Sequence, residues 1–306
     1  MSAPQDVPLE AGALLRPVSF GRKLKDRTVS VLVYVAFALA VIPLGAVLWV
    51  VVSKGLARFD GTFFTHSMEG VPALGPDSAG GGAYHAIIGT VEQVGLAAAM
   101  AIPLGVLAAI YLTEYGRRSR LSRTVSFFVD VMTGVPSIVV GLFVLALMFI
   151  LVGTSFVGFG FAASIALAIL MLPTVVRSTE EMLKLVPNEL REASYALGVP
   201  RWRTICFVVL PTALTGIVTG VMLGVARIMG ETAPVLLLVF GSNAINNNPF
   251  SNPQESLPLF VYSQAALPQD AATNRAWTGA LTLILIVMLL NLVARLIAWW
   301  RRPVRR

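Results

Sequence analysis

The sequence predicts an all-α membrane protein with six transmembrane helices. Of its 306 residues, 56% are apolar and only 13% are charged, whereas soluble chains average about a quarter charged residues. The apolar residues form long blocks, and a helix that spans a bilayer needs roughly 20 such residues at 1.5 Å each. In addition, basic residues gather in every second connection between these blocks.

Six apolar stretches are long enough to cross a bilayer, and together they define one membrane domain. We expect this domain to occupy residues 29–300, between a polar N-terminal tail, 1–28, and a basic C-terminus, 301–306. The first stretch is too long for a signal peptide and lacks an Ala-x-Ala-like cleavage site, so we expect it to remain as an anchor. The stretches are 29–53, 84–114, 125–152, 156–176, 207–240 and 277–300.

The net charge of +7 is explained by membrane topology and does not indicate binding of nucleic acid. Basic clusters precede the first stretch, separate the second from the third and the fourth from the fifth, and close the chain. The alternate connections hold only Lys54, Arg58 and Arg275. Because basic residues accumulate in cytoplasmic loops, the pattern predicts a multi-pass protein with both termini in the cytoplasm.

Several kinds of chemistry lack the residues that they need. Cys206 is the only cysteine, and His66 and His85 are the only histidines, so we expect no intrachain disulfide and no Cys/His metal site. No lysine stands in the Gly-Lys-Ser/Thr setting of a P-loop, and the Gly-x-Ser-x-Gly and His-Glu-x-x-His motifs are missing. We therefore expect no catalytic residue and no cofactor in this chain.

The fifth apolar stretch carries a proline and two charges. Pro234 cannot donate a hydrogen bond to the carbonyl of Gly230, so we expect the helix to break near residue 230, as helices do where they line a cavity. Arg227 and Glu231 lie four residues apart on one face and can pair. A charge at mid-bilayer costs about 2.5–3.5 kcal/mol, so two roles remain open. The pair either locks two helices together or offers an anion the donor fork of the arginine.

The connection 178–206 predicts a short amphipathic helix that ends in a tight turn. Asn188 is a suitable N-cap, and Leu190, Ala193 and Leu197 share one face by helical spacing. Gly198 is expected to stop the helix, with Pro200 just beyond it. Such a helix is either a rigid knob for a partner or an interfacial helix on lipid headgroups.

Two further connections are long, and long loops tend to be functional. They cover residues 54–83 and 241–276 and are expected outside the cell, where they either only connect spans or dock a partner. Within the second, Ser256–Leu267 is apolar but too short to span a bilayer, which favours a re-entrant or interfacial position.

Several motifs resemble those of a known family. Residues 192–194 (Glu-Ala-Ser), Gly198 and residues 208–211 (Val-Val-Leu-Pro) resemble the EAA loop of binding-protein-dependent ABC importer permeases, in which Ser194 replaces an alanine. Residues 134–143 and 227–234 resemble helix signatures of the A-type (PstA-type) permeases of phosphate-specific importers. The resemblance extends over roughly residues 20–300.

The resemblance implies the type I ABC importer permease (MetI-like) fold in the bacterial inner (plasma) membrane. It implies that the chain forms half of a phosphate pore, completed by a homologous PstC-type permease, and is surrounded by membrane lipid. It also implies a dimer of PstB-type ATPase subunits, which bind the ATP and magnesium, and an extracytoplasmic PstS-type phosphate-binding protein. In this family the EAA helix docks into a groove of the ATPase, which assigns coupling to Glu192, Ala193, Ser194 and Gly198.

The resemblance assigns the substrate pathway first to Arg227 and Glu231, beside the break at Gly230 and Pro234, and then to Arg177. Arg177 has an alternative role as an interfacial anchor whose charge reaches the headgroups. We expect Glu92 and Asp130 to be structural. Two other functions remain open: an ABC permease for sulfate, molybdate or an amino acid, or a secondary carrier or channel that works without an ATPase.

Overall fold

The computed structural model describes residues 20–72, 80–116, 119–153 and 158–300. The predicted C-terminal segment 301–306 and most of the predicted tail 1–28 lie outside these ranges. The chain divides into two compact units at Val50 and Val51, and each unit is described by itself. Within the described residues the fold is helical, and the only β-type contact is an isolated bridge between Phe159 and Pro253.

The described part of the first unit belongs to a single helix, α1 (Phe20–Gly55), which extends five residues into the second unit. Its side chains between Phe20 and Val50 are exposed although most of them are apolar, as expected for a helix surrounded by lipid. The described helix reaches back to Phe20, beyond the apolar stretch that the sequence places at 29–53. Residues 20–28 are polar but continue the helix because they include good helix formers such as Lys23 and Lys25.

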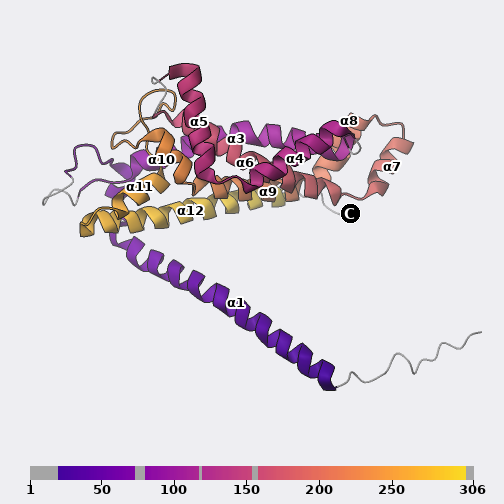
Figure 1. Cartoon of the computed structure of the whole chain (residues 1–306), viewed down its shortest axis with the longest axis horizontal. Coiled ribbons are helices and arrows are strands. Elements are labelled where there is room, and N and C mark those ends of the chain that lie inside the picture. Colours follow the sequence, from indigo (N-terminus) through magenta and orange to yellow (C-terminus); the bar gives the residue numbers. More distant parts are fainter. Residues whose placement is uncertain (1–19, 73–79, 117–118, 154–157, 301–306) are drawn as a thin grey trace, which may run out of the picture. The chain divides into compact units, whose positions relative to one another are not determined.

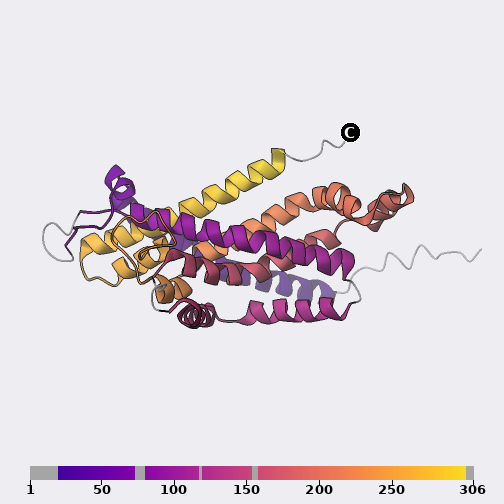
Figure 2. The same ribbon diagram turned by 90° about the horizontal axis from the view of Figure 1, so that it is seen from above.

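The second unit is a bundle of long helices with short elements at both ends (Figures 1 and 2). Across both units, five described helical segments are long and apolar enough to cross a membrane, the first of them containing α1, and the bent pair Arg120–Gly134 plus Ser137–Val152 gives a sixth candidate span. In chain order the elements are η2 (Leu56–Arg58), α2 (Gly61–Thr65), α3 (Tyr84–Ile110), η4 (Tyr111–Tyr115), α4 (Arg120–Gly134), α5 (Ser137–Val152), α6 (Gly160–Lys184), α7 (Asn188–Ala196), α8 (Arg201–Thr204), η6 (Ile205–Val209), α9 (Leu210–Met229), α10 (Ala233–Val239), α11 (Leu257–Ala265) and α12 (Asp270–Trp300).

The third predicted stretch, 125–152, is not one helix. It is divided into α4 and α5, which meet at an angle of 109°. Val135 adopts an extended conformation because the residue before a proline avoids the α region, and Pro136 follows it with ψ 137°. The two pieces contain 15 and 16 residues, so only the pair together has the length of a span.

The core of the bundle lies where α3, α6 and α9 pack side by side. Its buried side chains include Ala97 and Ala101 from α3, Val175 from α6 and Ile217 from α9. Small residues allow these helices to approach closely, as is common between membrane helices. At Gly105 of α3 an added Cβ would lie 2.7 Å from Cγ1 of Val175, so any larger residue would push α3 and α6 apart.

The loops are shorter than the sequence predicted. The predicted connection 178–206 begins inside α6, which continues to Lys184 because Glu180, Glu181 and Lys184 favour helix and point to the surface or to partners. At the opposite end α11 forms within the predicted apolar segment Ser256–Leu267 and packs against α12 and α3. Its first backbone N–H, at Leu257, donates to Oγ1 of Thr90 at 2.7 Å.

Candidate functional site

The fifth predicted span is interrupted, as Pro234 and Gly230 predicted. Helix α9 ends at Met229, Gly230–Thr232 are non-helical, and α10 begins at Ala233. Pro234 lies in the first turn of α10, where its missing N–H leaves no intrahelical bond unmade. In addition, the break is packed against the other bent span, because a Cβ on Gly141 of α5 would lie 2.8 Å from Cα of Pro234.

The charged pair at this break is loose. The Nε atom of Arg227 lies 3.8 Å from Oε1 of Glu231, and the two side chains are 49% and 19% exposed. Among the described residues the guanidinium of Arg227 has no partner other than Glu231, and 3.8 Å is too long for a hydrogen bond, so its N–H donors are available. Its position in the last turn of α9 is favourable because that end of the helix carries partial negative charge.

Arg177, the second predicted pathway residue, is bound on several sides. Its guanidinium forms ion pairs with Asp130 of α4 and Glu180 of α6. It also donates to Oγ of Ser126 at 3.3 Å and to the carbonyl of Ser126 at 3.0 Å. The structure therefore joins Arg177 to α4 and not to Arg227 or Glu231. Asp130 thus has Arg177 as its partner. Glu92 accepts a hydrogen bond from Gln254.

The predicted amphipathic helix is α7, and Gly198 ends it as expected. Gly198 has φ +75°, a conformation that favours glycine. Its N–H donates to the carbonyl of Tyr195 at 2.9 Å, and that of Val199 donates to Ser194 at 3.2 Å, the pattern of a Schellman motif. The predicted N-cap is wrong by one residue: Pro187 occupies that position with ψ 139°, and Asn188 is already helical.

The two faces of α7 differ from a simple amphipathic pattern. Glu192 and Ala193 are exposed, as are Leu190 at 42% and Leu197 at 83%, so the apolar residues that the sequence placed on one face look away from the bundle. The inward face instead carries polar groups, among them Ser194, whose hydroxyl lies 2.8 Å from that of Thr204. Of the predicted coupling residues, Ser194 alone is buried.

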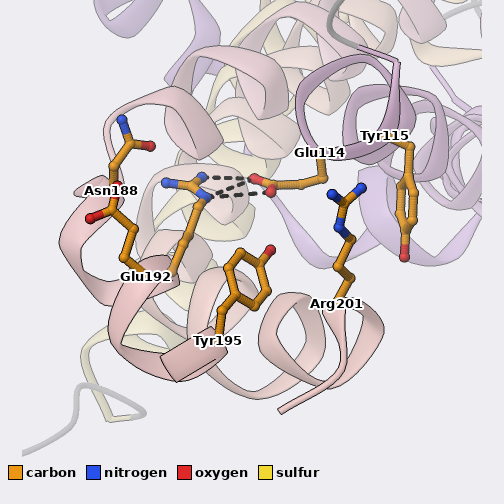
Figure 3. A pocket seen from close by; sticks show the side chains of 7 residues that line it. Glu114, Tyr115, Asn188, Glu192, Tyr195 and Arg201 are labelled. Atoms are coloured by element: carbon orange, nitrogen blue, oxygen red, sulfur yellow. Dashed lines mark hydrogen bonds and ion pairs between the residues drawn. The ribbon is translucent and has the colours of Figure 1, made fainter. Parts of the chain in front are cut away.

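A cavity of about 500 Å³ opens where α7 meets the end of α3 (Figure 3). Dashed lines in Figure 3 run to Glu114 and mark its ion pair with Arg191, at 2.7 Å between Nη2 and Oε1. The sequence treated Arg191 only as a topology signal and did not single out Glu114. The available clue was that Arg191 lies three residues before Ser194, on the same face of the helix. The cavity is lined by Glu114, Tyr115, Asn188, Arg191, Glu192, Tyr195 and Arg201.

A second cavity, of about 380 Å³, lies at the opposite end beside Glu255. This carboxylate is 6% exposed and accepts backbone hydrogen bonds from Ser242 at 3.3 Å and Ser256 at 3.1 Å. Burial raises the pKa of Glu255 from its ordinary 4.5 to about 7. The contact to Ser242 holds a turn in which Phe240 and Gly241 both have positive φ, at 60° and 74°.

Sequence comparison places these features in a known family. Residues 101–302 match the profile described as "Binding-protein-dependent transport system inner membrane component". The chain is 48% identical over 285 residues to "Phosphate transport system permease protein PstA 1" of Mycobacterium tuberculosis H37Rv, covering 93% of this chain and 91% of the relative. It is 41% identical to PstA of Yersinia pestis over 276 residues, covering 90% of each. This chain belongs to the binding-protein-dependent transport permeases and, among them, to the PstA family.

Solved structures agree with this PstA-family membership at the level of the fold. The MetNI methionine ABC transporter in an inward-facing conformation matches with a TM-score of 0.57 at 23% identity, covering 72% of this chain and 94% of that chain. A bacterial alginate ABC transporter matches with a TM-score of 0.63 at 14% identity, covering 88% and 94%. The predicted all-α fold of ABC importer permeases is thus confirmed, and the protein is a multi-pass membrane protein.

Proposed function

We propose that this chain is the transmembrane permease subunit of an ATP-driven importer of inorganic phosphate, and that it forms half of the pore. The observation that carries the proposal is the similarity to relatives named phosphate transport permeases, at 48% identity over nearly the whole chain. The half-exposed Arg227 fits this substrate, because its free donors match two oxygens of a phosphate in bidentate geometry. A proline break beside it supplies the non-helical backbone that a pathway needs.

The exposed face of α7 is proposed to dock an ATPase subunit. Its apolar and acidic residues, Leu190, Leu197 and Glu192, have no partner among the described residues to cover them. ATP and magnesium would be bound by that ATPase and not by this chain, whose role is then non-catalytic. A homologous PstC-type permease would complete the pore, and a PstS-type phosphate-binding protein would deliver the substrate from outside.

Uptake by the assembled complex tests this function. The permease, co-expressed with its neighbouring permease and ATPase and reconstituted in proteoliposomes with the binding protein outside, should accumulate labelled phosphate only when ATP is inside. Competition by unlabelled phosphate, but not by sulfate, molybdate or amino acids, is expected. Import of one of those solutes instead, or uptake without ATP, would overturn the proposal.

The orientation of α7 follows from the same proposal. In a Cys206→Ser background, a cysteine at Asn247 should be labelled by a membrane-impermeant reagent from outside the cell. A cysteine at Ala193, which is exposed on α7, should be labelled only after permeabilisation. Outside labelling at Ala193 would place α7 on the wrong side for an ATPase.

A further inference from the structure

The guanidinium of Arg191 joins three elements at the base of α7. Arg191 is only 5% exposed. Nε and Nη2 donate to the carboxylate of Glu114 at 2.7–3.3 Å. Nη2 also donates to the carbonyl of Leu183 at 2.9 Å, and Nη1 donates to that of Val186 at 2.6 Å and of Pro187 at 3.5 Å. The cation therefore neutralises a buried carboxylate and satisfies one carbonyl in the last turn of α6 and two in the connection to α7.

The two polar links of α7 both lead to π-helical turns. Glu114 lies in η4, the π-helical continuation of α3, and Thr204, which pairs with Ser194, directly precedes the π-helical η6 that leads into α9. Such turns interrupt the regular ladder of a helix and are frequent at functional positions. The end of α7 is thus tied tightly to the points at which two membrane spans depart from regular α-helix.

The inward face of α7 is held by hydrogen bonds, whereas a loop that only connects two spans needs no such fixed geometry. An apolar inward face would allow α7 to slide over the bundle, because apolar contacts are not directional. The guanidinium of Arg191 makes six directed hydrogen-bond contacts, two of which share the single Nε–H, and together they fix both the distance and the orientation of α7. The exposed side of α7, in contrast, is left open to a partner.

We propose that Arg191 and Glu114 are positioning residues of the coupling step. They make α7 move as one body with the ends of α3 and α6, so that a displacement of α7 by the ATPase reaches the spans through η4 and α6. This inference rests on the proposed function of the chain, and its signature is a change in the phosphate transported for each ATP hydrolysed.

The test is a double variant in the reconstituted complex. Arg191→Met together with Glu114→Met removes both buried charges and so avoids an unpaired one. The complex should still assemble and hydrolyse ATP, while the phosphate imported per ATP falls by about twofold to thirtyfold. Lys184→Gln serves as the matched control, because it also removes a cation near the end of α6. The side chain of Lys184 is 60% exposed, so its loss should leave the ratio of phosphate to ATP unchanged.

A covalent link between positions 114 and 191 should restore coupling. With Glu114→Cys and Arg191→Cys in a Cys206→Ser background, the ratio should be low under reducing conditions and rise when a short bifunctional thiol reagent joins the two positions. An unchanged ratio in the double methionine variant, or no recovery on cross-linking, would overturn the positioning role.

If the double methionine variant does not assemble, Arg191→Lys decides. It keeps the cation but loses the donor fork, and a ratio equal to that of the wild type would refute the proposal. A wild-type complex that imports no phosphate would instead refute the proposed function.

Discussion

Arg191 and Arg227 stand at opposite extremes of the same chemistry. At the α7 junction, Arg191 is buried and bonded to a carboxylate and three carbonyls. At the break between α9 and α10, Arg227 is half exposed and has one carboxylate at 3.8 Å. A guanidinium has five N–H donors, and the two sites differ in how many of these are already used.

The difference separates a structural cation from one that can bind a ligand. We call an arginine saturated when its N–H donors are already hydrogen-bonded within the protein. A saturated arginine cannot bind an anion without breaking hydrogen bonds that hold helices in place. An unsaturated arginine inside a membrane keeps its desolvation cost uncompensated until a ligand arrives, which is typical of substrate pathways. By the same measure Arg177, bound to Asp130, Glu180 and Ser126, resembles the structural case more closely.

The largest expected effect is at Arg227. Arg227→Gln should abolish phosphate uptake while the protein still inserts and assembles, and Arg227→Lys should retain part of it, since a lysine keeps the charge but not the bidentate geometry. Labelled phosphate uptake in proteoliposomes measures both. The double change Arg227→Gln with Glu231→Gln should also be inactive. Normal uptake by the double variant at normal abundance would mean that Arg227 only balances Glu231.

The next largest effect is a loss of unfolding free energy, which should differ between variants of Arg191 and Arg227. Arg191→Met alone leaves Glu114 buried without its cation and should cost about 3–5 kcal/mol of unfolding free energy. Arg227→Gln should cost less than about 1 kcal/mol, because its ion pair with Glu231 is loose, at 3.8 Å. Thermal unfolding of the purified proteins in detergent compares them. Equal losses for the two variants would contradict the division into saturated and available arginines.

A smaller effect is expected at the end of α7. Gly198→Asp places a side chain at φ +75°, which costs about 1–3 kcal/mol, and puts a carboxylate at the negative end of the helix. No atom lies within 4 Å of the added Cβ, so the cost comes from the backbone and not from a clash. Co-purification with the ATPase should weaken. Gly198→Asn, which tolerates this conformation better, is the control and should bind more strongly than the aspartate variant.

The smallest effect concerns Glu255, which is buried like Arg191 but has no counter-cation among the described residues. Its raised pKa means that the folded state binds more protons between pH 4.5 and about 7, so stability should fall as pH rises through this window. Glu255→Gln should remove this dependence and be more stable than the wild type at pH 8, because the amide carries no charge to desolvate. Melting temperatures at pH 5 and pH 8 test it, and a parallel pH dependence in both proteins would assign the effect elsewhere.

The sequence by itself determined where the spans lie and where α7 stops. Spans follow from length and apolar composition, and Gly198 follows from a local rule about backbone conformation, so neither needs knowledge of the partners. The break at Gly230 was also predictable from Pro234. The same rule applies to Pro136, but it applies equally to prolines that stay inside continuous helices, so by itself it did not single out the break in the third stretch.

Only the tertiary structure decided which prolines break a helix and which charges are bound. Pro43, Pro103 and Pro173 lie inside continuous helices, whereas Pro136 and Pro234 lie at breaks, and Pro234 packs against Gly141 of α5. The carboxylate partner of Arg191 is 77 positions away in sequence, and Asp130, one of the two carboxylate partners of Arg177, is 47 positions away. Local pattern shows that a charge is present, but its pairing depends on which helix ends the fold brings together, because hydrogen bonds act only over about 3 Å.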